Sequence, residues 1–361
     1  MNQMAHDDLQ TQIKALEQKM KAHMDTYQSF SPGIHRTQAA LPIFISRCHH
    51  LTITLLNKHT LSFGLTHVKF STMLLLFRSK NKHLTMTDIS QQKHVTRTNI
   101  TNLIDALEKD GYVERQKDPA DRRSAIIHLT ERGSAVVYDQ LQSYWDRQKW
   151  IFDGLDQNEQ EDMLSLICLL IATLQQKSEA AVYSLDASKE QARLVSSMMS
   201  DILDSYHAVT PDIHRSSAAL SILLARVYNL TIFQLNKHTM ELGLSHAKFS
   251  TLLLLFRSDG QNLTMTDISQ QKNVTKTNVT KLIDGLEQDG LVQRMKDPAD
   301  RRSSIIVLTE KSKAFIPQHL QDYWDKQKWV FNGLDETQLT RLLQLLLKLL
   351  ATLRLKEQTD F

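Results

Sequence analysis

Apolar residues recur every three or four positions along most of the chain, the spacing that places them on one face of an α-helix. This pattern predicts helices over residues 35–61 and 67–78, separated by a glycine break. Two shorter helices are expected from about 86 to 92 and from about 96 to 110, where Gly111 supplies a left-handed stop. The pattern therefore predicts two helices followed by a helix-turn-helix.

The spacing of the hydrophobic residues changes after the helix-turn-helix, where two short β-strands are expected. Residues 113–116 and 125–129 have the composition of strands, and Pro119 suits the second position of the tight turn between them. A long helix should then run from about 131 to 152, and a strongly apolar last helix should reach about residue 176. A hairpin and two helices thus complete the pattern.

The whole pattern is written twice, at a constant spacing of 179 residues. The tetrapeptide NKHT stands at 57–60 and again at 236–239. Residues 85–131 and 264–310 differ at only 11 of 47 aligned positions. The period is far longer than a solenoid unit, so the chain contains a duplicated domain.

The duplication sets the expected domain divisions. Residues 1–178 form the first domain with its N-terminal helix, 179–212 a helical linker with the first helix of the second copy, and 213–361 the second domain. The segment before the first copy has apolar residues at the helical positions Leu9, Ile13, Leu16, Met20 and Met24. Each copy therefore begins with an amphipathic helix that needs a partner.

Composition supports a helical, globular protein. Hydrophobic residues make up 41% and charged residues 23%, while Gly (10 of 361) and Pro (6) are too few for a turn-dense β-sandwich. The net charge of +3 does not by itself identify an anionic partner. The apolar stretches 164–174 and 342–350 are shorter than the roughly 20 residues that span a bilayer, so buried helices and no membrane are expected.

Two cysteines and a polar start, MNQMAHDDLQ, indicate a reducing cytoplasm. Cys48 and Cys168 have no counterpart in the other copy, so buried small apolar side chains are expected rather than redox sensors. No metal site and no cofactor is expected. The chain shows no phosphate loop, nucleophile elbow, zinc motif or paired carboxylates, so an enzyme is not expected.

The second helix of the helix-turn-helix has two distinct faces. Ile100, Leu103, Ile104 and Leu107 follow the i, i+3, i+4, i+7 pattern and should face the core. The opposite face carries hydrogen-bonding side chains and no carboxylate. Its candidate DNA-binding residues are Thr96, Arg97, Thr98, Asn99, Thr101 and Asn102.

This face suits DNA chemically. Asn can bond an adenine edge in two places, Thr can contact thymine, and Arg can read guanine or bind the backbone, while the helix N-terminus favours a phosphate. The second copy offers a related set, Thr275, Lys276, Thr277, Asn278, Thr280 and Lys281, so it should read a related half-site. The alternative is that this polar face is simply a solvated surface.

The hairpin tip adds paired arginines in both copies: Arg122, Arg123, Arg301 and Arg302. Their position suits entry into an adjacent minor groove, where the negative potential attracts Arg. Asp118 or Asp121 could instead pair with one Arg and hold the loop. One Arg in each role is expected.

The run TMTDISQQKHVTRTNITNLIDALEKDGYVERQKDPADRRSAIIHLTERG resembles the winged helix-turn-helix core of the MarR family of bacterial transcription regulators. The resemblance covers roughly 34–176 and 213–355 and rests on the DPADRR wing, the DG before the first strand and the LTE after the second. It implies a dimerisation region of terminal helices, a recognition helix in the major groove and a wing in the minor groove.

The tandem fusion departs from the family's usual homodimer. The expected fold is mainly α with a small β-hairpin wing, in two tandem winged helix-turn-helix domains whose helical dimerisation regions form an intrachain pseudodimer. Such a chain would present two recognition helices to half-sites about one helical turn apart, so its operator need be only approximately palindromic.

The resemblance implies a sequence-specific double-stranded-DNA-binding transcriptional regulator, and the expected form is a repressor that a small aromatic or phenolic acid effector releases. The candidate effector-binding residues are His35, Arg36, Tyr144, His214, Arg215 and Tyr323. They offer cations for a carboxylate and aromatic surface, although aromatic residues on a long helix also serve as packing. The alternative function is an interaction protein that has lost DNA binding and titrates another regulator.

Overall fold

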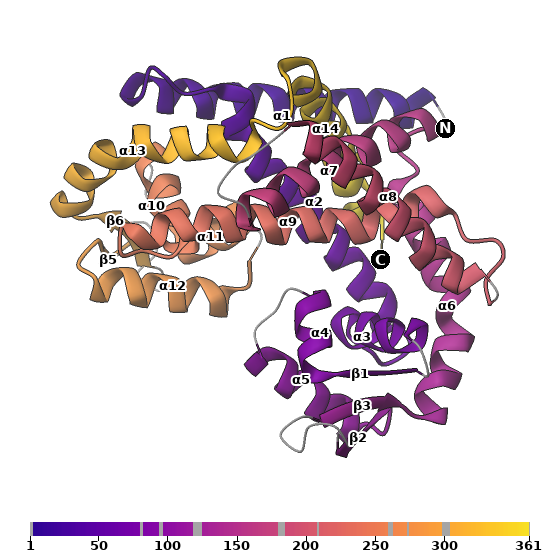
Figure 1. Ribbon diagram of the computed structural model, residues 1–361. Helices are drawn as coiled ribbons and strands as arrows, with labels where there is room; N and C mark the ends of the chain where they lie inside the picture. The colour runs from indigo at the N-terminus through magenta and orange to yellow at the C-terminus, as the bar shows by residue number, and fades with distance from the viewer. Residues whose placement is uncertain are drawn as a thin grey trace. The chain divides into compact units, whose positions relative to one another are not determined.

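The computed structural model describes residues 3–79, 82–93, 97–117, 125–179, 185–207, 209–258, 263–272, 274–297 and 304–360. The chain is mainly α-helical and carries two small antiparallel sheets (Figure 1). The two repeats have the same order of elements, which confirms the expected tandem of two mainly α domains with small β-sheets.

The first repeat begins with an N-terminal helix. Its elements are α1 (Gln3–Phe30), α2 (Arg36–Leu61), α3 (His67–Arg78), β1 (His83–Thr85), α4 (Met86–Lys93), α5 (Arg97–Lys109), β2 (Val113–Lys117), β3 (Ala125–Leu129), α6 (Glu131–Phe152) and α7 (Gln157–Glu179).

The second repeat matches it element by element. It comprises α8 (Leu185–His207), α9 (Arg215–Glu241), α10 (His246–Arg257), β4 (Leu263–Thr264), α11 (Met265–Lys272), α12 (Lys276–Gln288), β5 (Val292–Lys296), β6 (Ser304–Leu308), α13 (Glu310–Phe331) and α14 (Glu336–Thr359).

Local chemistry sets several of the helix ends. The Thr66 side chain accepts a hydrogen bond from the Lys69 amide and caps α3, and the Thr130 side chain accepts one from the Gly133 amide and caps α6. Gly111, with φ 76°, follows α5 in the left-handed region that glycine adopts most readily. The predicted stop at Gly111 is therefore confirmed.

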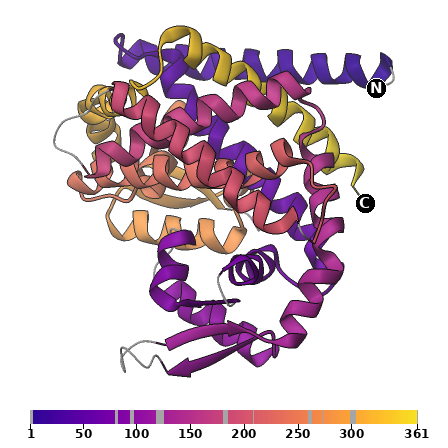
Figure 2. The same cartoon turned by 45° about the vertical axis from the view of Figure 1, so that its right-hand side comes forward.

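Each sheet has three strands, one more than the predicted hairpin. The strand orders are β1-β3-β2 and β4-β6-β5, and β2 pairs with β3 from Val113↔Leu129 to Lys117↔Ala125 (Figure 2). The additional strand β1 pairs with β3 through Leu84↔Ile127. A strand of three residues is too short to show a period of two, so the hydrophobic pattern could not reveal it.

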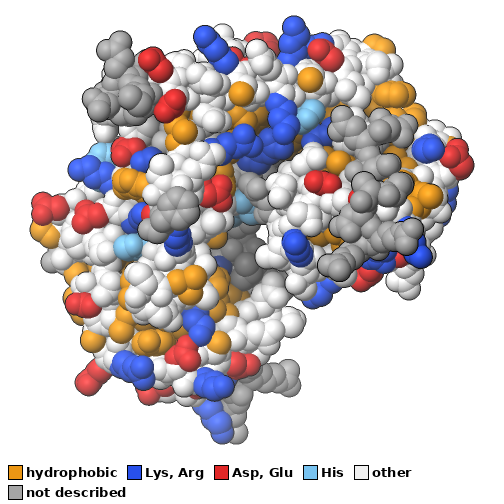
Figure 3. Space-filling model, turned by 180° about the vertical axis from the view of Figure 1, so that it is seen from behind, with side chains coloured by type: hydrophobic (Ala, Val, Ile, Leu, Met, Phe, Trp, Pro, Cys, Tyr) orange, Lys and Arg blue, Asp and Glu red, His pale blue; other side chains and the backbone are white. Residues whose placement is uncertain are grey.

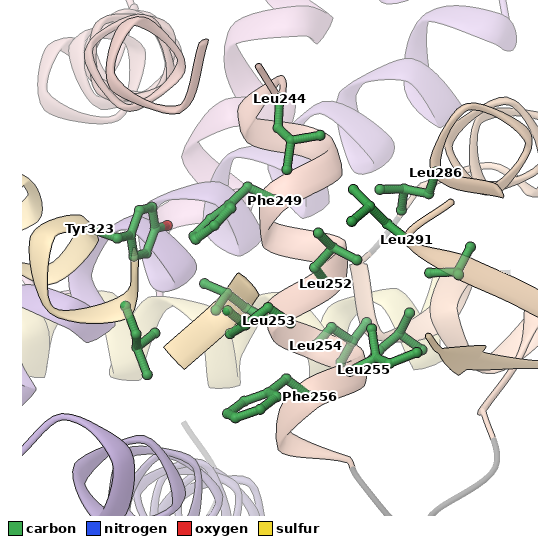
Figure 4. Close-up of a cluster of buried hydrophobic side chains, with 14 of the residues drawn as sticks. Leu244, Phe249, Leu252, Leu253, Leu254, Leu255, Phe256, Leu286, Leu291 and Tyr323 are labelled. Carbon is green, nitrogen blue, oxygen red and sulfur yellow. The ribbon is translucent and has the colours of Figure 1, made fainter. Parts of the chain in front are cut away.

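The core around α10 shows how the winged helix of the second repeat is held together. This helix buries successive side chains, including Leu252, Leu253, Leu254 and Leu255 (Figure 4). A helix that is apolar on all sides must be covered on all sides. Figure 4 shows Leu286 and Leu291 on one side of α10 and Tyr323 beside the helix's own Phe249.

The chain forms two compact units, and each takes elements from both repeats. One unit comprises residues 1–47, 173–185 and 230–351, and the other 48–172, 186–229 and 352–361. The first unit holds the second winged helix together with α1, while the second unit holds the first winged helix together with α8. The compact units therefore differ from the sequence divisions 1–178, 179–212 and 213–361.

The N-terminal helices explain this exchange. Tyr27 of α1 donates a hydrogen bond to the backbone oxygen of Leu253 in α10 (3.0 Å). Tyr206 of α8 donates the matching bond to Leu74 in α3 (2.9 Å). Each amphipathic helix thus finds its apolar partner in the winged helix of the other repeat.

Two helices are long and apolar enough to cross a membrane by length and composition alone. They are α2 and α9, with mean hydropathy of 1.3 and 1.4 over 18 residues. In each, 61% of that window is buried inside the protein, as in core helices of water-soluble proteins. These helices, rather than the stretches singled out from the sequence, are the most span-like segments among the described residues.

Candidate nucleic-acid interface

Helix α5 presents the polar face that the sequence predicts. Ile100, Ile104 and Leu107 are almost fully buried, and Leu103 is half-buried. The opposite residues, Thr98, Asn99, Thr101 and Asn102, are all exposed. Thr96 and the side chain of Arg97 lie outside the described residues.

Helix α12 repeats this arrangement in the second copy. Val279, Ile283 and Leu286 are buried. The predicted residues Thr275, Lys276, Thr277, Asn278, Thr280 and Lys281 are all exposed. Both helices therefore offer an acid-free polar surface over their first two turns, and in the second copy Lys276 replaces Arg97 and Lys281 replaces Asn102.

Two of the threonines on α12 also have local structural roles. The Thr275 side chain caps the helix by accepting a hydrogen bond from the Asn278 amide (3.3 Å). Thr280 donates its hydroxyl to the Lys276 backbone oxygen (3.0 Å). Because the Thr275 hydroxyl still has a proton to donate, capping leaves it able to bond a phosphate.

The first helix of the helix-turn-helix is fixed by a reciprocal cap. Asp88 accepts hydrogen bonds from the Thr85 amide (3.1 Å) and hydroxyl (2.7 Å), and the Asp88 amide donates to the Thr85 oxygen (3.1 Å). Thr264 and Asp267 repeat this arrangement in the second copy. The Asp88 carboxylate is therefore occupied at the start of α4.

A lysine ties this helix to the one before it. Lys93 at the end of α4 donates to the Ser71 hydroxyl of α3 (2.9 Å), and Lys272 donates to Ser250 in the same way (2.8 Å). Burial lowers the pKa of both ammonium groups to about 8. These lysines hold the helix-turn-helix in place, a role that the sequence analysis did not assign.

A second missed residue joins the recognition helix to the hairpin. Arg115 of β2 forms ion pairs with Glu108 (2.8 Å) and with Asp105, both on α5. Arg294 repeats these pairs with Glu287 and Asp284. The signal was present in the sequence, since two carboxylates three positions apart recur in both copies with an arginine on the following strand.

These ion pairs shape the charge of the interface. On the face shown in Figure 3, most Lys and Arg side chains are interspersed with Asp and Glu, apart from one group of basic side chains. On α5, the carboxylates lie in the second half of the helix and pair with Arg115. The first half of α5 is left without acidic residues that would repel phosphate. The wing arginines Arg122, Arg123, Arg301 and Arg302, with Asp118 and Asp121, lie outside the described residues.

The candidate effector residues do not gather as the sequence grouped them. His35, Arg36 and Tyr323 belong to one compact unit, whereas Tyr144, His214 and Arg215 belong to the other.

Both tyrosines are core residues. Tyr144 is 4% exposed and packs edge-on against Phe70 (5.1 Å between ring centroids). Tyr323 is 3% exposed and contacts Phe249 (4.8 Å; Figure 4). Burial raises the pKa of both phenols well above the usual range, so both remain neutral.

The four polar candidates have partners within the protein. His35 lies 3.0 Å from the Glu336 carboxylate, and Arg36 pairs with Asp25 at 2.5 Å. His214 shares a hydrogen bond with Ser217 (2.9 Å), and Arg215 pairs with Asp204 (2.8 Å). These four contacts fix the starts of α2 and α9.

The cysteines are buried and unpaired with each other. Burial raises the pKa of the Cys168 thiol to about 11, which opposes formation of a reactive thiolate. Among the residues that the structure describes, no three His, Cys, Asp or Glu side chains are placed to hold a metal ion.

The geometry defines the class of protein. Each repeat has a helix-turn-helix, an exposed polar recognition helix and a β-hairpin wing, which together form a winged helix-turn-helix DNA-binding domain. Residues 65–125 and 244–304 both match the MarR family. The chain belongs to the MarR family, whose members are DNA-binding regulators rather than enzymes.

The chain is similar to several named proteins. The HTH-type transcriptional repressor YetL of Bacillus subtilis is 36% identical over 121 residues, which cover 28% of this chain and 72% of YetL. The HTH-type transcriptional regulator PrsX of Escherichia coli is 35% identical over 102 residues, and the match spans only 60% of PrsX. A DNA complex of Sco3205, a MarR family regulator from Streptomyces coelicolor, is 26% identical, with a TM-score of 0.30 over 32% of this chain and 72% of that one.

Proposed function

We propose that this protein is a sequence-specific double-stranded-DNA-binding transcriptional regulator of the cytoplasm. The observation that carries the proposal is the repetition, on α5 and α12, of an exposed polar face whose first two turns contain no carboxylate. A solvated helix surface has no reason to exclude acidic residues twice. The two domains are 1–178 and 213–361, joined through 179–212, which holds the helical linker and the first helix of the second copy.

One chain acts as an intrachain pseudodimer in this proposal. The exchange of α1 and α8 between the repeats supports it, because neither winged helix has its complete core without a helix from the other repeat. Two recognition helices would then read half-sites about one helical turn apart. Since Arg97 and Asn102 are replaced by Lys276 and Lys281, the half-sites would be similar but unequal.

The mode of regulation is repression that a small aromatic or phenolic acid relieves. Repression is supported by the name of the 36% identical relative, a transcriptional repressor. The exposed Arg36 and Arg215 would contact the carboxylate of the effector, while the buried Tyr144 and Tyr323 would act through packing. The competing function is titration of another regulator without DNA binding.

The test is selection of tight-binding duplexes from a random pool by the full chain at a stated salt concentration. We expect an inverted pair of related half-sites, bound by one chain of 41.5 kDa per duplex. Two chains per duplex would contradict the pseudodimer. No enrichment over a matched variant carrying Asn99→Asp and Asn278→Asp would favour the interaction protein.

The wing gives a separate prediction. Replacing Arg122 with Ala should weaken binding to all sequences alike and lower the slope of log K against log salt by about 1 for each phosphate that the arginine no longer binds. Affinity measured at several salt concentrations checks this, with Arg301→Ala as the matched variant. An unchanged salt slope in both variants would assign the wing arginines to holding the loop.

A further inference from the structure

The two recognition helices differ by one methyl group in their second half. Residue 106 of α5 is alanine, whereas the equivalent residue of α12 is Gly285. Gly285 lies inside α12 with ordinary helical backbone, unlike Gly290, which follows the helix with φ 71°. The backbone conformation at residue 285 therefore does not require glycine. Glycine inside a helix makes that helix less stable than alanine does, because glycine loses more conformational freedom on folding.

A lysine of α10 fills the space beside Gly285. A Cβ atom at residue 285 would lie 2.8 Å from Lys248 Cε and 3.0 Å from Lys248 Nζ, closer than a side chain tolerates. Lys248 uses this close approach to donate a hydrogen bond to the Gly285 backbone oxygen (3.1 Å), and it also pairs with Asp289 (2.6 Å). Lys248 thus ties the last turn of α12 to α10.

The first copy has only part of this contact. Lys69 of α3 pairs with Asp110 (2.5 Å) as Lys248 pairs with Asp289. The Ala106 oxygen accepts a bond from the Asp110 amide (3.1 Å), and within the described part of the chain Lys69 makes no bond to it. Since Ala106 carries the Cβ atom that Gly285 lacks, Lys69 cannot lie over the helix as Lys248 does.

The second halves of the two helices are otherwise almost the same. From 103 to 111 the copies differ only at Ala106, replaced by Gly285, and at Lys109, replaced by Gln288. Lys109 places a cation in the last turn of α5, where it interacts favourably with the helix dipole, and Gln288 does not. Both differences therefore make α12 less stable than α5.

We propose that α12 is the looser of the two recognition helices, and that the chain therefore reads its second half-site less strictly than its first. Discrimination between base pairs depends on donors and acceptors that are held in place. In a looser helix Asn278 can adjust to a mismatched base pair at lower cost. Lys248 is a positioning residue that limits this freedom. The unequal reading rests on the proposed function, whereas the difference in helix stability does not.

Hydrogen exchange of the full chain without DNA tests the helix stability. We expect the amides of α12 to exchange faster than the matching amides of α5. Gly285→Ala should slow exchange in α12 about fivefold, and Ala106→Gly should accelerate exchange in α5 about fivefold, the ratio that the helix propensities of the two residues give. Lys248→Met should accelerate exchange at the end of α12 more than Lys69→Met does at the end of α5.

Selection of duplexes from a random pool tests the reading. In the unmodified chain, the half-site that responds to Asn278→Ala should tolerate more bases than the other half-site. Gly285→Ala should sharpen the preference at this half-site by as much as about fivefold, and Ala106→Gly should relax the other by a similar factor. Ala135→Gly, on an exposed position of α6, is the control and should leave both preferences unchanged.

Equal exchange of α12 in the unmodified chain and in the Gly285→Ala variant would overturn the proposal. Equally strict half-sites in the unmodified chain would overturn the unequal reading, and so would an unchanged preference in a Gly285→Ala variant whose α12 exchanges more slowly. Thermal unfolding identifies any variant that has lost its fold, and the other of the Gly285→Ala and Ala106→Gly pair then decides. Enrichment of no duplex by any of these proteins would refute the proposed function and the unequal reading together, while the exchange rates still decide the stability of α12.

Discussion

At the scale of single residues, the repeat supplies its own control. The polar residues of α5 and α12 are exposed at matching positions, while the apolar residues between them are buried in both. In the proposed interface, Asn99 and Asn278 are amides at matching positions of the two copies, and an amide can bond an adenine edge in two places.

Replacing Asn99 with Ala should relax the preference at one base pair at a cost of about 1–3 kcal/mol. Competition between the selected duplex and its single-base variants measures this effect. Asn278→Ala should act in the same way on the other half-site. If Asn99→Ala weakened every sequence equally, this side chain would be a backbone contact instead.

Acid stability depends on a pair of buried histidines at the start of α3 and α10. Burial lowers the pKa of His67 and His246 from 6.5 to about 3, so both rings are neutral in the folded protein at pH 7. Between pH 3 and 6.5 the unfolded chain therefore binds more protons than the folded protein. The stability that the neutral rings provide is therefore present above pH 6.5 and is lost as the pH falls toward 3.

Replacing His67 with Phe should accordingly flatten the fall of unfolding free energy between pH 6.5 and 4. The expected difference is close to one proton, at most about 1.4 kcal/mol per pH unit. Urea unfolding at several pH values gives this slope, and adding His246→Phe should remove a second proton. Identical slopes in the variant and the unmodified chain would show that His67 titrates alike in both states.

At the scale of elements, much of the fold was predictable and the joints between elements were not. The bounds of α3 and α6 follow directly from the hydrophobic period and the capping threonines. The period could not reveal β1, which has only three residues, or the ion pairs of Arg115, which depend on side-chain direction. Of the candidate site, the exposed helix faces were predictable because 100° per residue fixes them. The grouping of Tyr144 with His35 was not, because the compact units divide each repeat and place these two residues in different units.

Arg115 gives a prediction about how the hairpin and recognition helix act together. Replacing it with Met should weaken DNA binding severalfold, because Asp105 and Glu108 lose their counter-ion beside the proposed DNA-binding face of α5. Stability should change by less than about 1 kcal/mol, since these ion pairs are partly exposed. Adding Asp105→Asn and Glu108→Gln should restore affinity, as measured by duplex titration, and failure of this rescue would assign Arg115 a purely structural role.

At the scale of the whole molecule, the two repeats exchange helices and are not simply two separate domains that follow one another along the chain. Each compact unit needs a helix from the other repeat, so the two repeats cannot separate without exposing apolar surface on α3 and α10. A gene fusion of two such units fixes the exchange within one chain and removes its dependence on protein concentration. The copies can then diverge, as Lys276 and Lys281 in place of Arg97 and Asn102 show.

The exchange itself can be measured with a matched pair of variants. Tyr27→Phe removes the hydroxyl that bonds Leu253, and Tyr206→Phe removes the one that bonds Leu74, each leaving a buried carbonyl oxygen without that donor at a cost of about 1–3 kcal/mol. Hydrogen exchange should therefore accelerate in α10, in the second repeat, after the change at residue 27, and in α3, in the first repeat, after the change at residue 206. Faster exchange of α3 in the Tyr27→Phe variant, with α10 unchanged, would mean that each N-terminal helix packs on its own repeat and would remove the physical basis of the intrachain pseudodimer.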